Sequence, residues 1–192
     1  STMEYLLEKH PEFVHSRAVT HMYQNGRVGI LGDWGVGAPG LAIKLECLVE
    51  HGTKKFIAVG TAGSLLEEHQ IGDCVICPKA LAEDGVAHLY LPKGERVAEA
   101  DSGLIDEWMD FAKDHSVPPL KPAMAWSFSA IFKETLADVR RVHRLGCSVV
   151  EMEAATLYAI AKEKGVQTFS LFVISDMLTE AEWKPHLRLP EV

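Results

Sequence analysis

The chain has 192 residues, of which 47% are hydrophobic and 24% are charged. This composition excludes a disordered or fibrous protein and fits one globular domain over residues 1–192. The formal net charge is −8, and the most basic stretch, 140–144, is too short for a nucleic-acid footprint, so we expect no nucleic-acid partner. We find no signal peptide and no apolar run near the ~20 residues needed to cross a bilayer, so we expect a cytoplasmic protein without a membrane partner.

Short apolar runs alternate with amphipathic segments along the chain. The runs of strand length are 28–32, 56–59, 74–81, 123–128 and 168–174, and a further short apolar strand at 149–150 leads into a helix. Helical spacing predicts helices at 41–50, 104–115, 134–145 and 154–164, three of which end at a glycine, whereas 85–100 is predicted to be a loop. The strands are apolar throughout, so both faces of the sheet should be covered by helices. We therefore predict an α/β protein with three layers (αβα).

The cysteines and histidines do not indicate a metal site. Cys74 and Cys77 form a CxxC pattern, but they lie on a predicted strand, where alternation sends them to opposite faces. We expect free thiols and no metal. The nine histidines have no ligand spacing.

Three polar motifs follow predicted strands: Glu151-Met152-Glu153, Ser175-Asp176 and Gly60-Thr61. Ligands of such sheets collect outside the carboxyl ends of the strands, so these motifs predict a site. Acidic residues also favour a helix N-terminus for electrostatic reasons, so a capping role for the glutamates stays open. The turn at 35–37 precedes a helix whose N–H groups suit an anion, although an ordinary tight turn explains the glycines equally well.

These motifs occur in an order and spacing that resembles the nucleoside phosphorylase and nucleosidase superfamily, which contains purine nucleoside phosphorylases, uridine phosphorylases and methylthioadenosine-type nucleosidases. The resemblance runs from about residue 25 to residue 176. It implies a mixed, curled central sheet flanked by helices. The matching segments are 35–40, 60–64, 71–73, 151–153 and 174–176.

The resemblance implies roles for the sugar-binding residues. Glu153 would accept hydrogen bonds from the ribose hydroxyls, Met152 would pack against the sugar and Glu151 would support the site. Phe132 would stack on the base, although a place in the hydrophobic core is an open alternative.

The resemblance also implies that Asp176, next to Ser175 in the substrate-binding segment, protonates or hydrogen-bonds the departing purine at N7. Asp176 must then be protonated near neutral pH. We expect burial beside Phe172 and Ile174 to favour the protonated form.

Phosphate would be held by Gly60 and Thr61, and by Arg17 lent from a neighbouring subunit. The last role implies a homo-oligomer built from dimers, up to a hexamer. Phosphorylases carry an arginine three residues before this threonine, where the chain has Ala58, and hydrolytic members lack that arginine too. The family's first strand with its loop and the family's closing helix have no counterpart in the sequence.

The sequence therefore predicts a nucleoside phosphorylase, a pentosyltransferase that uses inorganic phosphate as co-substrate and needs no other cofactor. The substrate would be a purine-type nucleoside. A hydrolytic nucleosidase, a uridine-type phosphorylase and a non-catalytic nucleoside-binding protein stay open as alternatives.

Overall fold

The computed structural model describes residues 2–17, 20–23, 27–32, 35–178 and 183–184. The chain forms two compact units, Ser1–Val36 and Gly37–Val192. Each unit is described by itself below. None of the described helices is long and apolar enough to span a membrane.

The first unit contains one helix and a small antiparallel sheet. Helix α1 (Thr2–Lys9) precedes strands β1 (Phe13–Arg17), β2 (Thr20–Tyr23) and β3 (Gly29–Leu31), which lie in the order β1-β2-β3. Only the last of these elements was expected from its apolar run. Strands β1 and β2 are only five and four residues long and mix polar with apolar residues, so their hydrophobic pattern is too weak to predict them.

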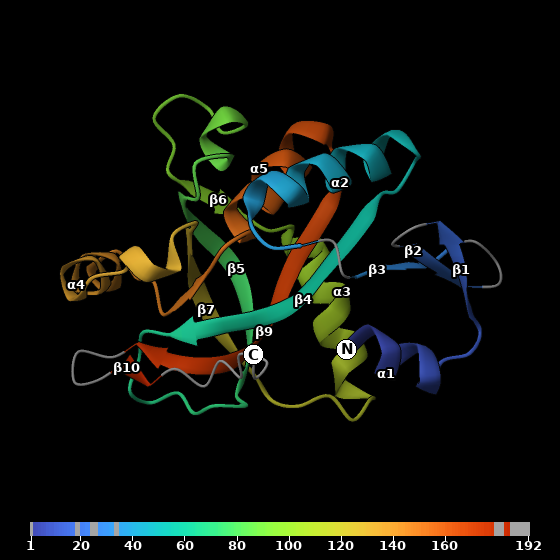
Figure 1. Ribbon diagram of the computed structural model, residues 1–192, viewed down its shortest axis with the longest axis horizontal. Helices are drawn as coiled ribbons and strands as arrows, with labels where there is room; N and C mark the ends of the chain where they lie inside the picture. The colour runs from blue at the N-terminus through green and yellow to red at the C-terminus, as the bar shows by residue number, and fades with distance from the viewer. Residues whose placement is uncertain (1, 18–19, 24–26, 33–34, 179–182, 185–192) are drawn as a thin grey trace, which may run out of the picture. The chain divides into compact units, whose positions relative to one another are not determined.

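The second unit is built on a seven-stranded mixed sheet with the order β10-β9-β4-β8-β7-β5-β6 (Figure 1). Strand β9 also pairs antiparallel with β5 through residues 74–77, so the sheet curls back on itself. This arrangement confirms the predicted mixed, curled α/β fold. The strands are β4 (Lys55–Ser64), β5 (Cys74–Glu83), β6 (Val97–Glu99), β7 (Leu120–Phe128), β8 (Val149–Glu151), β9 (Gln167–Leu178) and β10 (Trp183–Lys184).

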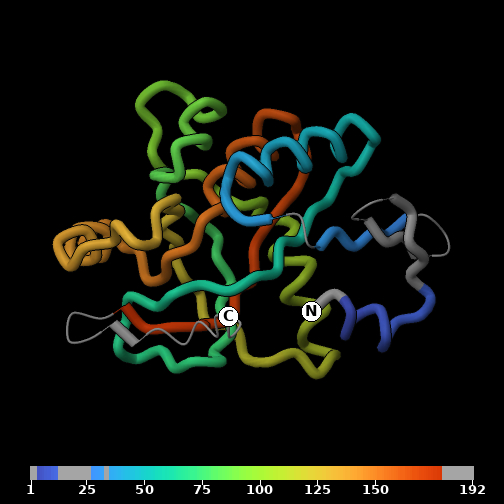
Figure 2. The backbone as a smooth tube through the Cα atoms, in the orientation of Figure 1, coloured from blue at the N-terminus to red at the C-terminus, as the bar shows by residue number. Residues whose placement is uncertain are grey.

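Helices cover both faces of this sheet. On one face α5 (Ala154–Lys164) packs against α2 (Ala38–Glu50), and Figure 2 shows the two helices next to each other. Residues 154–161 of α5 are all buried, because the helix lies between the sheet, α2 and the short helix η1 (Ala87–Leu89). It ends at Gly165, whose φ of 65° suits a glycine.

The opposite face is covered by α3 (Ser102–Lys113) and α4 (Leu136–Arg144). Leu104 of α3 packs with Ile76 and Phe169, and the valines of α4 pack against fully buried Trp126. Thr135 accepts a hydrogen bond from the Asp138 N–H at 3.1 Å and so fixes the start of α4. The predicted three-layer arrangement is therefore confirmed.

Two predicted strand ends are wrong. Strand β4 continues past Val59 to Ser64, and β9 continues past Ile174 to Leu178, so both polar motifs lie inside strands. The two strands pair in parallel over this whole length, and their many shared hydrogen bonds outweigh the weak strand propensity of glycine. Ala62 pairs with Ile174 and Gly63 pairs with Asp176, so Ser175 is the extra residue of a bulge.

The region 85–100 is not only a loop, since it contains η1 and β6. The predicted placement of Cys74 and Cys77 is confirmed. Cys74 lies opposite Val173 and Cys77 lies opposite Ser170, on different faces of the sheet, and all four cysteines are free.

Candidate active site

Glu151 ends β8 and caps the next helix. Its side chain is buried and accepts hydrogen bonds from the Ser127 hydroxyl and from the N–H groups of Glu153 and Ala154, the last two at 2.7 Å. Burial raises the pKa of Glu151 to about 7, although these donors oppose the shift. Glu151 therefore positions the start of α5, and its role in supporting a substrate site stays a prediction.

We expect the stability of the protein to fall as pH rises from about 5 to about 7. The folded state holds the Glu151 proton more tightly than the unfolded chain, whose glutamates titrate near 4.5, so this stabilisation is complete below 4.5 and lost as pH rises toward 7. Glu134 has a similarly raised pKa of about 7 and adds to the slope. Carboxyl groups whose pKa is lowered in the folded protein, such as Asp73, stabilise the folded state while they are ionised. This stabilisation is lost only when they become protonated, at lower pH.

Thermal unfolding at about pH 5 and about pH 8 measures this slope. Glu151→Gln should flatten it, whereas Glu163→Gln, at an exposed carboxylate of α5, should keep it. An unchanged slope in Glu151→Gln would contradict the expectation.

Glu153 directly precedes α5 and contacts a second helix. Its half-buried carboxylate accepts a hydrogen bond from the N–H of Gly37, the residue that caps the N-terminus of α2. Gly37 has a φ of 92°, a conformation that favours glycine. Burial raises the pKa of Glu153, and the Gly37 N–H opposes the rise. The anion at this helix N-terminus is therefore the protein's own carboxylate, with half-buried Met152 beside it in the chain.

Asp176 lies at one end of a row of residues that crosses the sheet. Its side chain is 7% exposed, and its Oδ1 accepts a hydrogen bond from the Ser175 hydroxyl at 2.7 Å. Asp176 pairs with Gly63 of β4, Gly63 pairs with Val150 of β8, and Val150 pairs with Trp126 of β7.

A glycine is needed at position 63 for this packing. A Cβ there would lie 3.1 Å from Asp176 Oδ2 and from Val150 Cγ1, and 2.7 Å from Leu178 Cδ1. Asp176 is buried, as expected, but the prediction that it lies beside Phe172 and Ile174 is wrong. Those two side chains pack in the core cluster of α5, whereas Asp176 lies on the face that α4 covers.

Thr61 lies on the same face of the sheet as Asp176 and is exposed. It pairs with Val173 of β9, two positions along β4 from the Gly63–Asp176 pair. Gly60 points to the other face, where a Cβ would lie 3.5 Å from the Phe172 ring. Arg17 is the last residue of β1, and its side chain lies outside the described residues, as does Trp34 in front of the glycine-rich turn.

Phe132 lies in the short helix η2 (Ile131–Lys133), and 85% of it is exposed, so the core alternative for this residue is wrong. The same connection between β7 and α4 carries Glu134, which sequence reasoning treated only as the start of a helix. Its side chain is half-buried, and burial together with the nearby charge of Asp176 raises its pKa to about 7. The sequence offered one signal that Glu134 lies near the site: it follows Phe132, the predicted stacking residue, by two positions.

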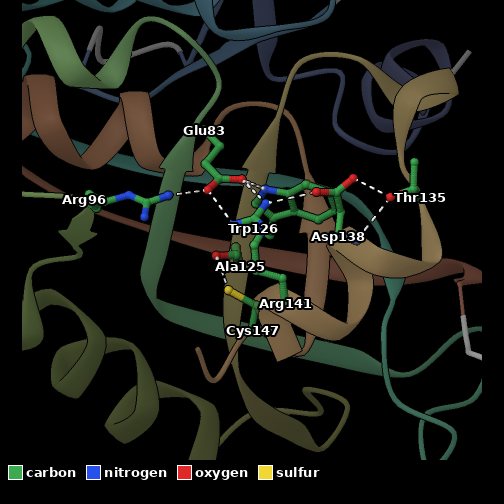
Figure 3. A network of polar contacts seen from close by, with 8 residues as sticks. All are labelled: Glu83, Arg96, Ala125, Trp126, Thr135, Asp138, Arg141 and Cys147. Atoms are coloured by element: carbon green, nitrogen blue, oxygen red, sulfur yellow. Dashed lines mark hydrogen bonds and ion pairs between the residues drawn. The ribbon is translucent and has the colours of Figure 1, made fainter. Parts of the chain in front are cut away.

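Glu83 holds α4 in place at the end of β5 (Figure 3). Both of its carboxylate oxygens accept hydrogen bonds from the Arg141 guanidinium at 2.8 Å, and Trp126 Nε1 donates to it at 2.8 Å. Arg96 donates from the other side, as Figure 3 shows. The bidentate ion pair fixes α4, and with it the 129–135 connection, relative to the sheet.

The structure therefore brings the predicted residues together in two groups. Asp176, Ser175 and Thr61 share one face of β4 and β9, and the charge of Asp176 contributes to the raised pKa of Glu134 in the 129–135 connection. Glu151, Met152 and Glu153 lie at the N-terminus of α5, where Glu153 contacts α2.

Comparisons with known proteins show the family of this chain. The family model described as "Phosphorylase superfamily" matches residues 2–188. A DeoD-type purine nucleoside phosphorylase of Streptococcus suis (strain 05ZYH33) is 32% identical over 164 residues, which cover 85% of this chain and 69% of the relative. A DeoD-type purine nucleoside phosphorylase of Lactococcus lactis subsp. cremoris (strain MG1363) is 33% identical over 168 residues, which cover 85% and 68%.

A solved structure described as the P knowlesi homolog of P falciparum PNP superposes with a TM-score of 0.68 at 29% identity. The match covers 81% of this chain and 64% of the solved one, so the chain spans less than two thirds of that protein's length. With the family model matched over nearly all of its residues, the chain belongs to the phosphorylase superfamily.

Proposed function

We propose that this protein is a purine nucleoside phosphorylase, which cleaves the N-glycosidic bond of a purine nucleoside with phosphate to give the free base and pentose 1-phosphate. The relatives with this name at 32% and 33% identity support the proposal. The observation that carries it is the buried carboxyl group of Asp176, at the position from which purine-cleaving family members act on the base.

The chemistry needs a group that helps the base to leave and a group that holds the sugar. Cleavage passes through an oxocarbenium-like centre, and a proton given to the purine lowers the cost of its departure. Asp176 supplies that proton, while Glu153 accepts hydrogen bonds from the ribose hydroxyls and Met152 packs against the sugar. Glu151 supports both neighbours through its bonds to the N–H groups at the start of α5.

Phosphate would bind near Thr61 with few charged partners. Ala58, at the position of the family's arginine, packs against the α2 and α5 core cluster, whereas Thr61 lies on the opposite, exposed side of β4. Losing one charge-assisted contact costs about 1.5–3 kcal/mol, roughly ten- to hundredfold in affinity. We therefore expect weak but measurable phosphate dependence, with Gly60 and the Arg17 of a neighbouring subunit as further ligands.

The proposal includes a homo-oligomer built from dimers, a cytoplasmic location and no metal or organic cofactor. Ala58 also favours a second candidate, a hydrolase that releases free pentose, because water needs no counter-charge.

Product identification separates these functions. The protein is incubated with adenosine, inosine, methylthioadenosine and uridine, with and without phosphate. Pentose 1-phosphate supports the proposed phosphorylase, and free pentose at a phosphate-independent rate supports the hydrolase. Faster cleavage of uridine than of every purine nucleoside would overturn the base assignment, and tight nucleoside binding without turnover would identify a non-catalytic protein.

A further inference from the structure

We propose that Glu83 is a positioning residue for base binding, because Glu83 and its neighbour Asp84 hold the two ends of the 129–135 connection that carries Phe132. The proposal rests on the proposed function, since it takes Phe132 as the residue that stacks on the purine. Its new element is the end of β5, which neither the sequence motifs nor the comparisons assign to the site.

The start of the connection is tied to the main chain of Asp84. The Ser129 hydroxyl donates to the Asp84 main-chain oxygen at 2.6 Å. Asp84 is itself fixed, because its buried carboxylate accepts from the hydroxyl of Thr156, in the first turn of α5, at 2.6 Å. The N–H groups of Val86 and Ala87 also donate to this carboxylate, both at 2.9 Å. The strand end therefore anchors the connection firmly at this side.

The end of the connection is tied to Glu83 (Figure 3). The Thr135 hydroxyl accepts from the Asp138 N–H at 3.1 Å and donates to the Asp138 carboxylate at 2.6 Å. Asp138 also accepts from Arg141 at 3.4 Å, and Arg141 donates to both carboxylate oxygens of Glu83 at 2.8 Å. A continuous chain of polar contacts therefore runs from the end of β5 to the last residue of the connection.

The surroundings of Glu83 suit an ionised carboxylate. Besides Arg141, the Trp126 Nε1 group donates to it at 2.8 Å. Arg96 is a further donor. The hydrogen bond from Arg141 lowers the pKa of Glu83, although burial opposes the shift. Because all these partners are donors, a neutral amide in the same place would turn its own NH2 donor toward one of them. The charge of Glu83 therefore helps to hold Arg141 and α4.

The placement of Phe132 depends on these two anchors. Its side chain is exposed and so is not held by the hydrophobic core. Within the connection the Lys133 N–H donates to the Ala130 main-chain oxygen at 2.7 Å, which keeps the turn around Phe132 compact. Loosening the Glu83 end should therefore weaken binding of the base and leave the groups that act on the glycosidic bond unchanged.

A double-mutant cycle of Glu83→Gln and Phe132→Ala tests this role. Removing the ring should raise KM for adenosine by about tenfold. Glu83→Gln should raise KM about three- to tenfold, with kcat changed less than about twofold. In the Phe132→Ala background the same change should alter KM by less than about twofold, because the ring that Glu83 positions is gone.

A matched control breaks another ion pair of β5. Glu99 of β6 pairs with Lys79 of β5 at 2.8 Å, and both side chains are exposed. Glu99→Gln removes this pair without touching α4 or the 129–135 connection, so it should keep the wild-type KM and kcat.

The outcomes separate the two proposals. If the wild type cleaves adenosine and Glu83→Gln raises KM equally with and without Phe132, or leaves KM unchanged, the positioning role is overturned and the proposed function stands. If the wild type cleaves no purine nucleoside, the proposed function fails and the positioning role fails with it. Thermal unfolding shows whether each variant is folded. If Glu83→Gln is not, the same cycle with Arg141→Lys, which keeps the charge but loses the bidentate contact, decides the matter.

Discussion

Replacing Asp176 with asparagine is expected to lower kcat for adenosine by about a hundredfold or more. Asparagine keeps the shape of the side chain and an oxygen that can accept the Ser175 hydroxyl, which donates to Oδ1 at 2.7 Å. It cannot give a proton to the purine. The loss should therefore appear in the chemical step, with substrate affinity largely kept. Steady-state kinetics with adenosine and phosphate measure both quantities.

The size of the kcat loss in Asp176→Asn should depend on the charge of the leaving base. A nucleoside whose base already carries the positive charge, such as 7-methylguanosine, leaves without protonation at N7, so Asp176→Asn should slow its cleavage much less. Asp110→Asn, at an exposed aspartate of α3 that pairs with Lys113, serves as the matched control and should retain wild-type kinetics on both substrates. Equal losses on both substrates in Asp176→Asn would refute the general-acid role and leave Asp176 a structural residue.

Replacing Glu153 with glutamine is expected to lower kcat/KM for ribonucleosides by about ten- to hundredfold. One carboxylate oxygen accepts the Gly37 N–H, and in the proposed function the carboxylate also accepts from a ribose hydroxyl. In glutamine the carbonyl can still accept from Gly37, but the group turned to the sugar becomes an amide donor. A charged acceptor is thereby lost at the position where the ribose is held.

A substrate without the hydroxyls provides the control for this prediction. A 2′,3′-dideoxynucleoside has no ribose hydroxyls at these positions, so Glu153→Gln should affect its cleavage much less than that of adenosine. Wild-type turnover of adenosine combined with lower thermal stability would instead mean that Glu153 serves only as a charge between the N-termini of α2 and α5.

The sequence alone predicted the features of the fold that depend on residues close together in the chain. Helix α5 was predicted at its observed bounds, because its apolar run begins after Glu153 and Gly165 supplies the left-handed residue that ends it. The three-layer fold followed from strands that are apolar on both faces. Membership of the phosphorylase superfamily followed from the order of the short motifs and is confirmed by the family match.

The tertiary structure decided the features that depend on pairing between distant segments. Strand β4 runs through Gly60 and Gly63 because β9 pairs with it along its whole length, which no local pattern reveals. The bulge at Ser175 determines that Asp176 faces α4 rather than the α5 core cluster.

The same dependence on distant contacts holds for the two carboxylates whose surroundings were not foreseen. Glu153 meets the N–H of Gly37, which is 116 positions away in the sequence, because α2 packs on α5. Burial and the charge of Asp176 raise the pKa of Glu134, which lies in the connection that enters α4. Residue type and spacing therefore determined which groups carry the chemistry. Their partners, and with them their protonation, depend on long-range packing, because desolvation and neighbouring charges exist only in the folded chain.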